Sequence, residues 1–106
     1  MTVKEFVDGL LCVPVTRVGN RFIIEAIEIV LDSREHKFYE ALSDITHQST
    51  GYLERAIRVA KDIGLNSMGP EQKIKIFGEN NLHPQNTEYI IKAADYYRRN
   101  YEDKES

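Results

Sequence analysis

Apolar residues recur along this chain at helical spacing, and short polar or glycine-containing segments separate the runs. The clearest run lies between Ser49 and Gly64, where one stripe consists of Leu53, Ile57, Ala60 and Ile63. Small polar residues precede this run and a glycine follows it, which predicts a helix from about Thr50 to Gly64. A rotation of about 100° per residue places the opposite side of this helix on Gly51, Glu54, Arg55, Arg58 and Asp62.

The same spacing predicts helices before this stretch. The first covers about residues 3–11 and opens with a capping box of Thr2 and Glu5. Gly19 is interpreted as a turn and Asn20 as the cap of a second helix that ends near Leu31. A third helix is expected from about 34 to 46, with Asp32 and Ser33 as its turn and cap.

Two more helices are predicted after Gly64. Pro70 fits the first turn of a short helix over 70–77, although the alternation in 73–77 could also form a strand. Asn86 or Thr87 is expected to cap the last helix, which extends through Tyr97 and could reach Tyr101, and residues 102–106 form a frayed tail. The chain is therefore predicted to be one all-α domain over residues 1–106, a compact bundle of about six helices.

Composition narrows the class of protein. The chain has 106 residues, a formal net charge of −3, 42% apolar residues and 29% charged residues, as in an ordinary globular domain. No apolar run is long enough for a membrane span, the N-terminus is not a signal peptide, and Cys12 is the single cysteine. We expect a cytoplasmic protein without membrane contact, in which Cys12 is a small buried hydrophobic residue.

Residues with catalytic or metal-binding chemistry do not cluster in the sequence. His36, His47 and His83 are far apart, and none forms a metal-binding spacing with another histidine or with Cys12. We expect no metal, no cofactor and no enzymatic activity. The tyrosines of the last helix (Tyr89, Tyr96, Tyr97 and Tyr101) could stack on single-stranded bases, but their helical spacing favours packing.

The third and fourth predicted helices are joined by His47, Gln48 and Ser49, a connection typical of a helix-turn-helix. Arg55 and Arg58 on the polar side could contact guanine, and Glu54 could accept a hydrogen bond from cytosine N4. An ordinary solvated helix with a Glu54–Arg58 ion pair would show the same pattern. Periodicity alone leaves these two interpretations open.

Several motifs along the chain favour the interpretation of this helix as one that contacts DNA. The hexapeptide 53–58, preceded by Ser49 and Thr50, resembles the recognition-helix motif of the C-terminal effector domain of the sporulation initiation response regulator, stage zero sporulation protein A. Residues 13–14, Gly19 and the Glu-Ala-Ile at 25–27 are similar to its valine-proline loop and second helix. Residues 76–78 and 84–90 resemble two further motifs, so the similarity covers about residues 6–98.

This resemblance implies a bacterial regulator of transcription that binds duplex DNA through a helix-turn-helix, with domains in tandem or as a homodimer on repeated sites. By position, the base-edge residues are Glu54, Arg55 and Arg58. The residues expected to contact the DNA backbone or to flank the interface are Arg17, Arg21, Ser49, Thr50, Gly51, Tyr52 and Lys61. The family's receiver domain has no counterpart in residues 1–106, so we expect regulation without an attached receiver.

Three positions of the motif depart from the family pattern. Gly51 and Tyr52 replace a serine-arginine pair, and Val59 replaces a histidine. These changes favour a second hypothesis, a protein-interaction module of the same fold that binds a regulator or an RNA polymerase subunit rather than DNA.

Overall fold

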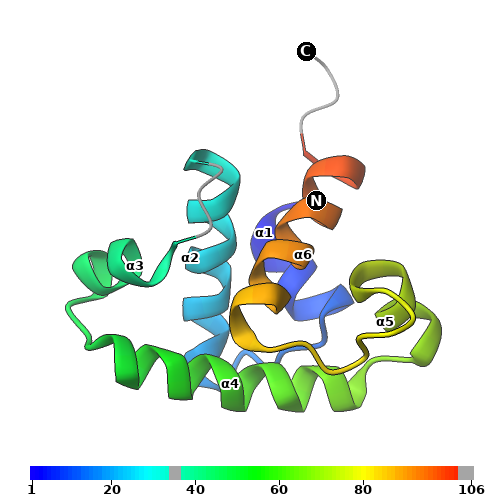
Figure 1. The fold of residues 1–106 in the computed structure, drawn as a ribbon, viewed down its shortest axis with the longest axis horizontal. Helices are drawn as coiled ribbons and strands as arrows, with labels where there is room; N and C mark the ends of the chain where they lie inside the picture. The colour runs from blue at the N-terminus through cyan, green and yellow to red at the C-terminus, as the bar shows by residue number, and fades with distance from the viewer. Residues whose placement is uncertain (34–36, 103–106) are drawn as a thin grey trace.

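The computed structural model describes residues 1–33 and 37–102, which form an all-α bundle (Figure 1). Its elements are α1 (Val3–Glu5), a π-helical turn η1 (Phe6–Leu10), α2 (Val18–Ser33), α3 (Tyr39–Thr46), α4 (Thr50–Ser67), α5 (Pro70–Phe77) and α6 (Asn86–Asn100). The described residues contain six α-helices and no strand, which confirms the predicted fold class.

The arrangement of the helices makes α4 one border of the molecule. In Figure 1, α4 runs along the bottom, α2 and α6 stand on it, and α3 and α5 lie at its two ends. The central helix α2 packs against both α4 and α6. The core lies between these three helices and α1–η1, and its largest fully buried side chains include Phe6, Ile23, Leu53, Ile57 and Tyr89.

The first predicted helix is confirmed in extent, with a change of geometry inside it. Thr2 accepts a hydrogen bond at 3.1 Å from the Glu5 amide, and Glu5 Oε1 accepts one at 2.8 Å from the Thr2 amide, so the capping box forms. The following turn is π-helical. Cys12, expected to be buried, is only half-buried and adopts a left-handed φ of 57° at the end of this segment.

The predicted start of the second helix is wrong. Gly19 is inside α2 and is buried against α4. Only glycine fits there, because a Cβ would lie 2.2 Å from the Ala56 carbonyl oxygen of α4. Asn20 is not a cap; its Nδ2 donates to Asp8 Oδ1 at 2.8 Å and to the Val13 carbonyl at 3.2 Å. Gly19 therefore permits close packing of α2 on α4 instead of forming a turn, and Asn20 joins α2 to the preceding segment instead of capping the helix.

The boundary between the second and third helices also differs from the prediction. Asp32 and Ser33 belong to the last turn of α2 and not to a turn before the next helix, and Ser33 Oγ donates to the Ile29 carbonyl at 2.8 Å. The third helix begins at Tyr39. The predicted start at Arg34, and His36, lie outside the described residues.

The predicted helix over 70–77 is confirmed as α5, with proline in its first turn.

Two other predictions of helix ends are wrong. Gly64 does not end α4, which continues to Ser67; Gly64 is buried where a Cβ would lie 2.7 Å from the Leu11 carbonyl oxygen. Gln85, not Asn86 or Thr87, holds the cap position of α6, since Asn86 Nδ2 donates instead to the Glu54 carbonyl at 2.8 Å and to Tyr39 Oη at 3.1 Å.

Candidate nucleic-acid interface

The connection between α3 and α4 fixes the direction of α4. Three residues, His47 to Ser49, separate the two helices, and His47 has a left-handed φ of 61°. Ser43 Oγ donates to the Gln48 carbonyl at 2.6 Å, and Ser49 Oγ accepts from the Tyr52 amide at 3.2 Å. Ser49 is therefore a helix cap, which gives α4 a defined start at the molecular surface.

The first half of α4 presents a broad exposed face. Leu53 and Ile57 are buried in the core, and the opposite side carries Thr50, Gly51, Tyr52, Glu54, Arg55, Arg58 and Val59, all exposed. At about 100° per residue, Arg55 lies near the middle of this arc. Glu54 and Arg58 lie on one flank of Arg55, and Tyr52, Ala56 and Val59 lie on the other.

The two arginines of α4 have different surroundings. Arg58 Nη1 donates to both carboxylate oxygens of Glu54, at 2.9 and 3.1 Å, so the ion pair of an ordinary solvated helix is present. Arg55 makes no ion pair with any described residue, and neither does Arg17 of the loop before α2. Arg55 and Arg17 are consequently the positive charges of this face that no described carboxylate neutralises.

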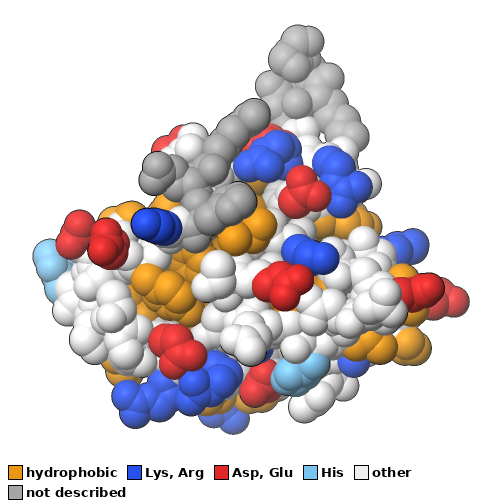
Figure 2. Space-filling view, viewed as in Figure 1, with side chains coloured by type: hydrophobic (Ala, Val, Ile, Leu, Met, Phe, Trp, Pro, Cys, Tyr) orange, Lys and Arg blue, Asp and Glu red, His pale blue; other side chains and the backbone are white. Residues whose placement is uncertain are grey.

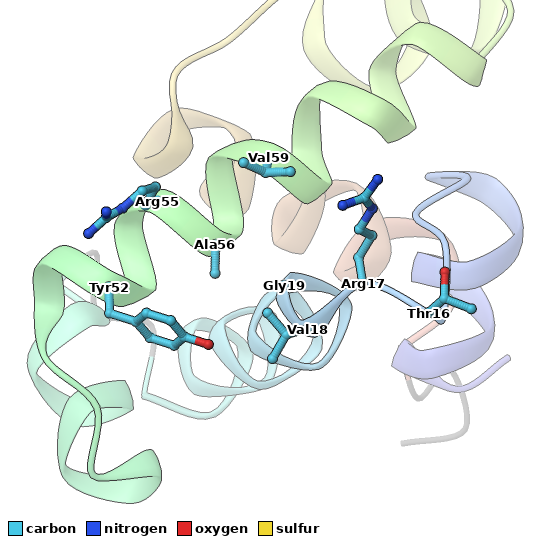
Figure 3. Close-up of a pocket in the computed structure, with 8 residues that line it drawn as sticks. All are labelled: Thr16, Arg17, Val18, Gly19, Tyr52, Arg55, Ala56 and Val59. Carbon is cyan, nitrogen blue, oxygen red and sulfur yellow. The ribbon is translucent and has the colours of Figure 1, made fainter.

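A hollow of about 380 Å³ lies between α4 and the start of α2. Its lining consists of Thr16, Arg17, Val18, Gly19, Tyr52, Arg55, Ala56 and Val59. In Figure 3, Tyr52 reaches from α4 toward α2, Arg17 extends beside Val59, and Arg55 points to the other side of the view. Figure 2 shows Lys and Arg side chains gathered along the lower border of the molecule, over α4.

Two predicted contact residues lie elsewhere. Lys61 is 4% exposed and its Nζ donates to the Pro84 carbonyl at 2.9 Å, so this ammonium supports the loop before α6 and is absent from the exposed face. Burial lowers the pKa of Lys61 from its usual range, against a smaller opposing effect of Asp62. Arg21 is exposed on α2 and pairs with Glu25 at 3.5 Å, and it does not line the hollow.

The hollow, with Thr16 and Val18 in its lining, is not predicted by the sequence pattern. The signal was present in Gly19, which allows the backbones of α2 and α4 to approach closely at Ala56. A glycine also marks turns, however, and only the packing of α2 on α4 distinguishes the two uses. The sequence likewise predicts a helix cap at Asn86, whereas its side chain joins α6 to α3 and α4.

The tyrosines of α6 contribute mainly to packing. Tyr89 is fully buried and stacks on Phe77, with ring centroids 5.1 Å apart, and Tyr97 is 8% exposed against Phe6. Within residues 1–33 and 37–102, no three His, Cys, Asp or Glu side chains come together as a metal site would require. None of the described helices has the length and apolarity needed to cross a membrane.

No known protein-family model matches the chain, and no curated protein is significantly similar to it.

Proposed function

We propose that this protein binds duplex DNA in a sequence-specific manner through the first half of α4 and regulates transcription. In this proposal, α3 and α4 act as a helix-turn-helix, with α4 in the major groove. The observation that carries it is Arg55, which lies in the middle of the exposed face without an ion-pair partner among the described residues. A free guanidinium on a protruding helix suits bidentate hydrogen bonding to guanine O6 and N7.

The neighbours of Arg55 supply the remaining contacts. Arg17, from the loop before α2, approaches the DNA backbone, together with Thr50 and Gly51 at the exposed start of α4. Arg58 contacts a base or a phosphate while Glu54 orients it, and a remaining lone pair of the Glu54 carboxylate, whose two oxygens both accept from Arg58, can accept from cytosine N4. Arg21 is a peripheral cation, and Ser49 acts as the cap that positions the helix.

The resemblance to the sporulation effector domain supports a bacterial, cytoplasmic regulator of this type. It also favours binding in tandem or as a homodimer on repeated sites. The acidic net charge of −3 makes non-specific affinity low, so recognition depends on this local face.

The proposal is tested by selection from random duplexes at low salt, followed by gel retardation on the enriched sequence. The Arg55→Ala variant should lose about 1–3 kcal/mol of binding free energy, a weakening of about 5- to 150-fold. Lys75→Ala is the matched control, since it removes one exposed positive charge from α5. No enrichment and no retardation on any duplex would overturn the proposal.

A second candidate function is a protein-interaction module that binds a regulator or an RNA polymerase subunit. Three exposed hydrophobic residues beside the hollow favour it: Val18 at 53%, Val59 at 44% and Tyr52 at 39% exposure. This hypothesis predicts no retardation of DNA and saturable binding to purified RNA polymerase. A Val59→Asp substitution should then abolish polymerase binding, whereas Arg55→Ala should change it little.

A further inference from the structure

Tyr52, Arg55 and Val59 lie on one stripe of α4, at the spacing i, i+3 and i+7. Tyr52 and Val59 flank the arginine on the side toward the hollow, and both are exposed, at 39% and 44%. Figure 3 shows these side chains along the same helix, with the Ala56 methyl between them. A helix that presents Arg55 to a groove therefore presents two apolar groups beside it.

The apolar flank is held in place by the fold. The Tyr52 ring meets Phe22 of α2 edge to face, with centroids 6.0 Å apart and planes at 77°. Gly19 lets α2 approach α4 closely behind the hollow, and Val18 forms the opposite wall. Because Tyr52 is fixed on one side by Phe22, its exposed edge has a defined position relative to Arg55.

The major groove of DNA offers one apolar group to such a surface, the 5-methyl group of thymine. The hollow carries Arg17 and Arg55 at its margin, so its charge complements DNA phosphates while the larger part of its lining is apolar. A helix rises about 1.5 Å per residue, so Tyr52 and Val59 lie about 4.5 and 6 Å along the axis from Arg55. Base pairs are about 3.4 Å apart, which places the contacted methyl groups within about two base pairs of the guanine.

We propose that Tyr52 and Val59 are specificity-determining residues that contact thymine methyl groups next to the guanine bound by Arg55. This inference rests on the proposed DNA binding and adds the base composition of the target. It predicts a site in which thymine is preferred within about two base pairs of guanine, on at least one side. Cytosine at that position lacks the methyl group and loses this contact.

The test replaces individual thymidines of the selected duplex by deoxyuridine, which differs only by lacking the 5-methyl group. At the contacted position, wild-type affinity should fall about four-fold, the effect of withdrawing one methyl from an apolar contact. Val59→Ala or Tyr52→Ala should bind the thymidine and deoxyuridine duplexes with equal affinity. Ile74→Ala is the matched control, since Ile74 is 40% exposed on α5, and it should retain the four-fold preference.

Thermal unfolding of each variant identifies any loss of affinity that comes from unfolding, because Tyr52 also contacts Phe22. The ratio of the two affinities is independent of the folded fraction of a variant. Duplex binding without any preference for thymidine over deoxyuridine would overturn this inference and leave the proposed function standing. So would a preference that persists unchanged in both Val59→Ala and Tyr52→Ala. Absence of binding to every duplex would overturn both proposals.

Discussion

The two halves of α4 carry similar residue types and use them differently. In the first half, Arg55 and Arg58 are exposed, and one of them has no ion-pair partner among the described residues. In the second half, Lys61 is buried and its ammonium binds the Pro84 carbonyl. The same helix thus provides a free cation for a ligand and a buried cation that stabilises a loop.

The difference comes from what surrounds each half. The C-terminal half is covered by residues 11–13 and by the loop that precedes α6. Gly64, Leu65 and the capping residue Met68 are buried there. The N-terminal half contacts the rest of the protein on its Leu53 and Ile57 side and leaves the other side open. Packing neighbours, and not the charge pattern of the helix, decide which cation remains accessible to a ligand.

The largest effect should come from adding a methyl group to each half of α4. Gly64→Ala places a Cβ 2.7 Å from the Leu11 carbonyl oxygen, so it should destabilise the protein by about 1–3 kcal/mol. Gly51→Ala adds a methyl to open space in the first turn, and it should stabilise the protein by up to about 0.5–1 kcal/mol. Urea unfolding measures both, and equal effects at the two glycines would contradict the contrast.

Lys61 and Arg55 should separate stability from binding. Lys61→Met keeps an apolar stem but leaves the Pro84 carbonyl without its donor, so it should lower the unfolding free energy by about 1–3 kcal/mol. Arg55→Ala should change stability by less than about 0.5 kcal/mol. If Lys61→Met unfolds like the wild type and loses DNA affinity instead, Lys61 belongs to the interface.

The buried lysine also predicts a pH dependence. Its pKa is lowered in the folded protein, so the unfolded state binds more protons between that pKa and about 10.4. The contribution of Lys61 to stability should therefore rise as pH rises through this window. The measurement compares urea unfolding of wild type and Lys61→Met at several pH values below 10.4, since the other titrating groups are common to both. A difference that shrinks with rising pH would show the opposite sign for the Lys61 pKa.

The smallest effect concerns the charged flank of Arg55. Glu54→Gln removes a carboxylate that repels phosphates and pairs with Arg58, so binding to an unrelated duplex should tighten by a few-fold at low salt. The gain should shrink at high salt because these charges are half-exposed. Titration of both proteins at two salt concentrations checks this, and an unchanged non-specific affinity would exclude a role for Glu54 in charge compensation.

The sequence predicted the helices better than their ends. Local signals sufficed for the Thr2–Glu5 capping box and for α5 with its initial proline. Gly19 and Gly64 match turn and stop signals in the sequence, but in the structure each permits a close approach of another segment. Asn20 and Asn86 match cap residues in the sequence, but each side chain bridges segments distant in sequence. Local patterns do not contain these non-local contacts.

The same limit applies to the candidate site. Helical periodicity placed Glu54, Arg55 and Arg58 on one exposed side, and the structure has them there. Helical periodicity could not distinguish Lys61 from these residues, because the burial of Lys61 depends on the loop at Pro84. The hollow beside Arg55 requires the crossing of α2 and α4, which no single stretch of sequence specifies.

The most direct test of DNA binding through the first half of α4 is a titration of isotope-labelled protein with the selected duplex, followed by backbone amide NMR shifts. The shifts should concentrate on residues 50–59 and on Thr16–Val18 beside them, and they should be absent from 61–68. Saturation at about 50 mM salt and weakening at higher salt are expected for phosphate contacts. Shifts confined to α5 and α6, or no shifts with any duplex, would contradict the assignment of α4 as the DNA-binding helix.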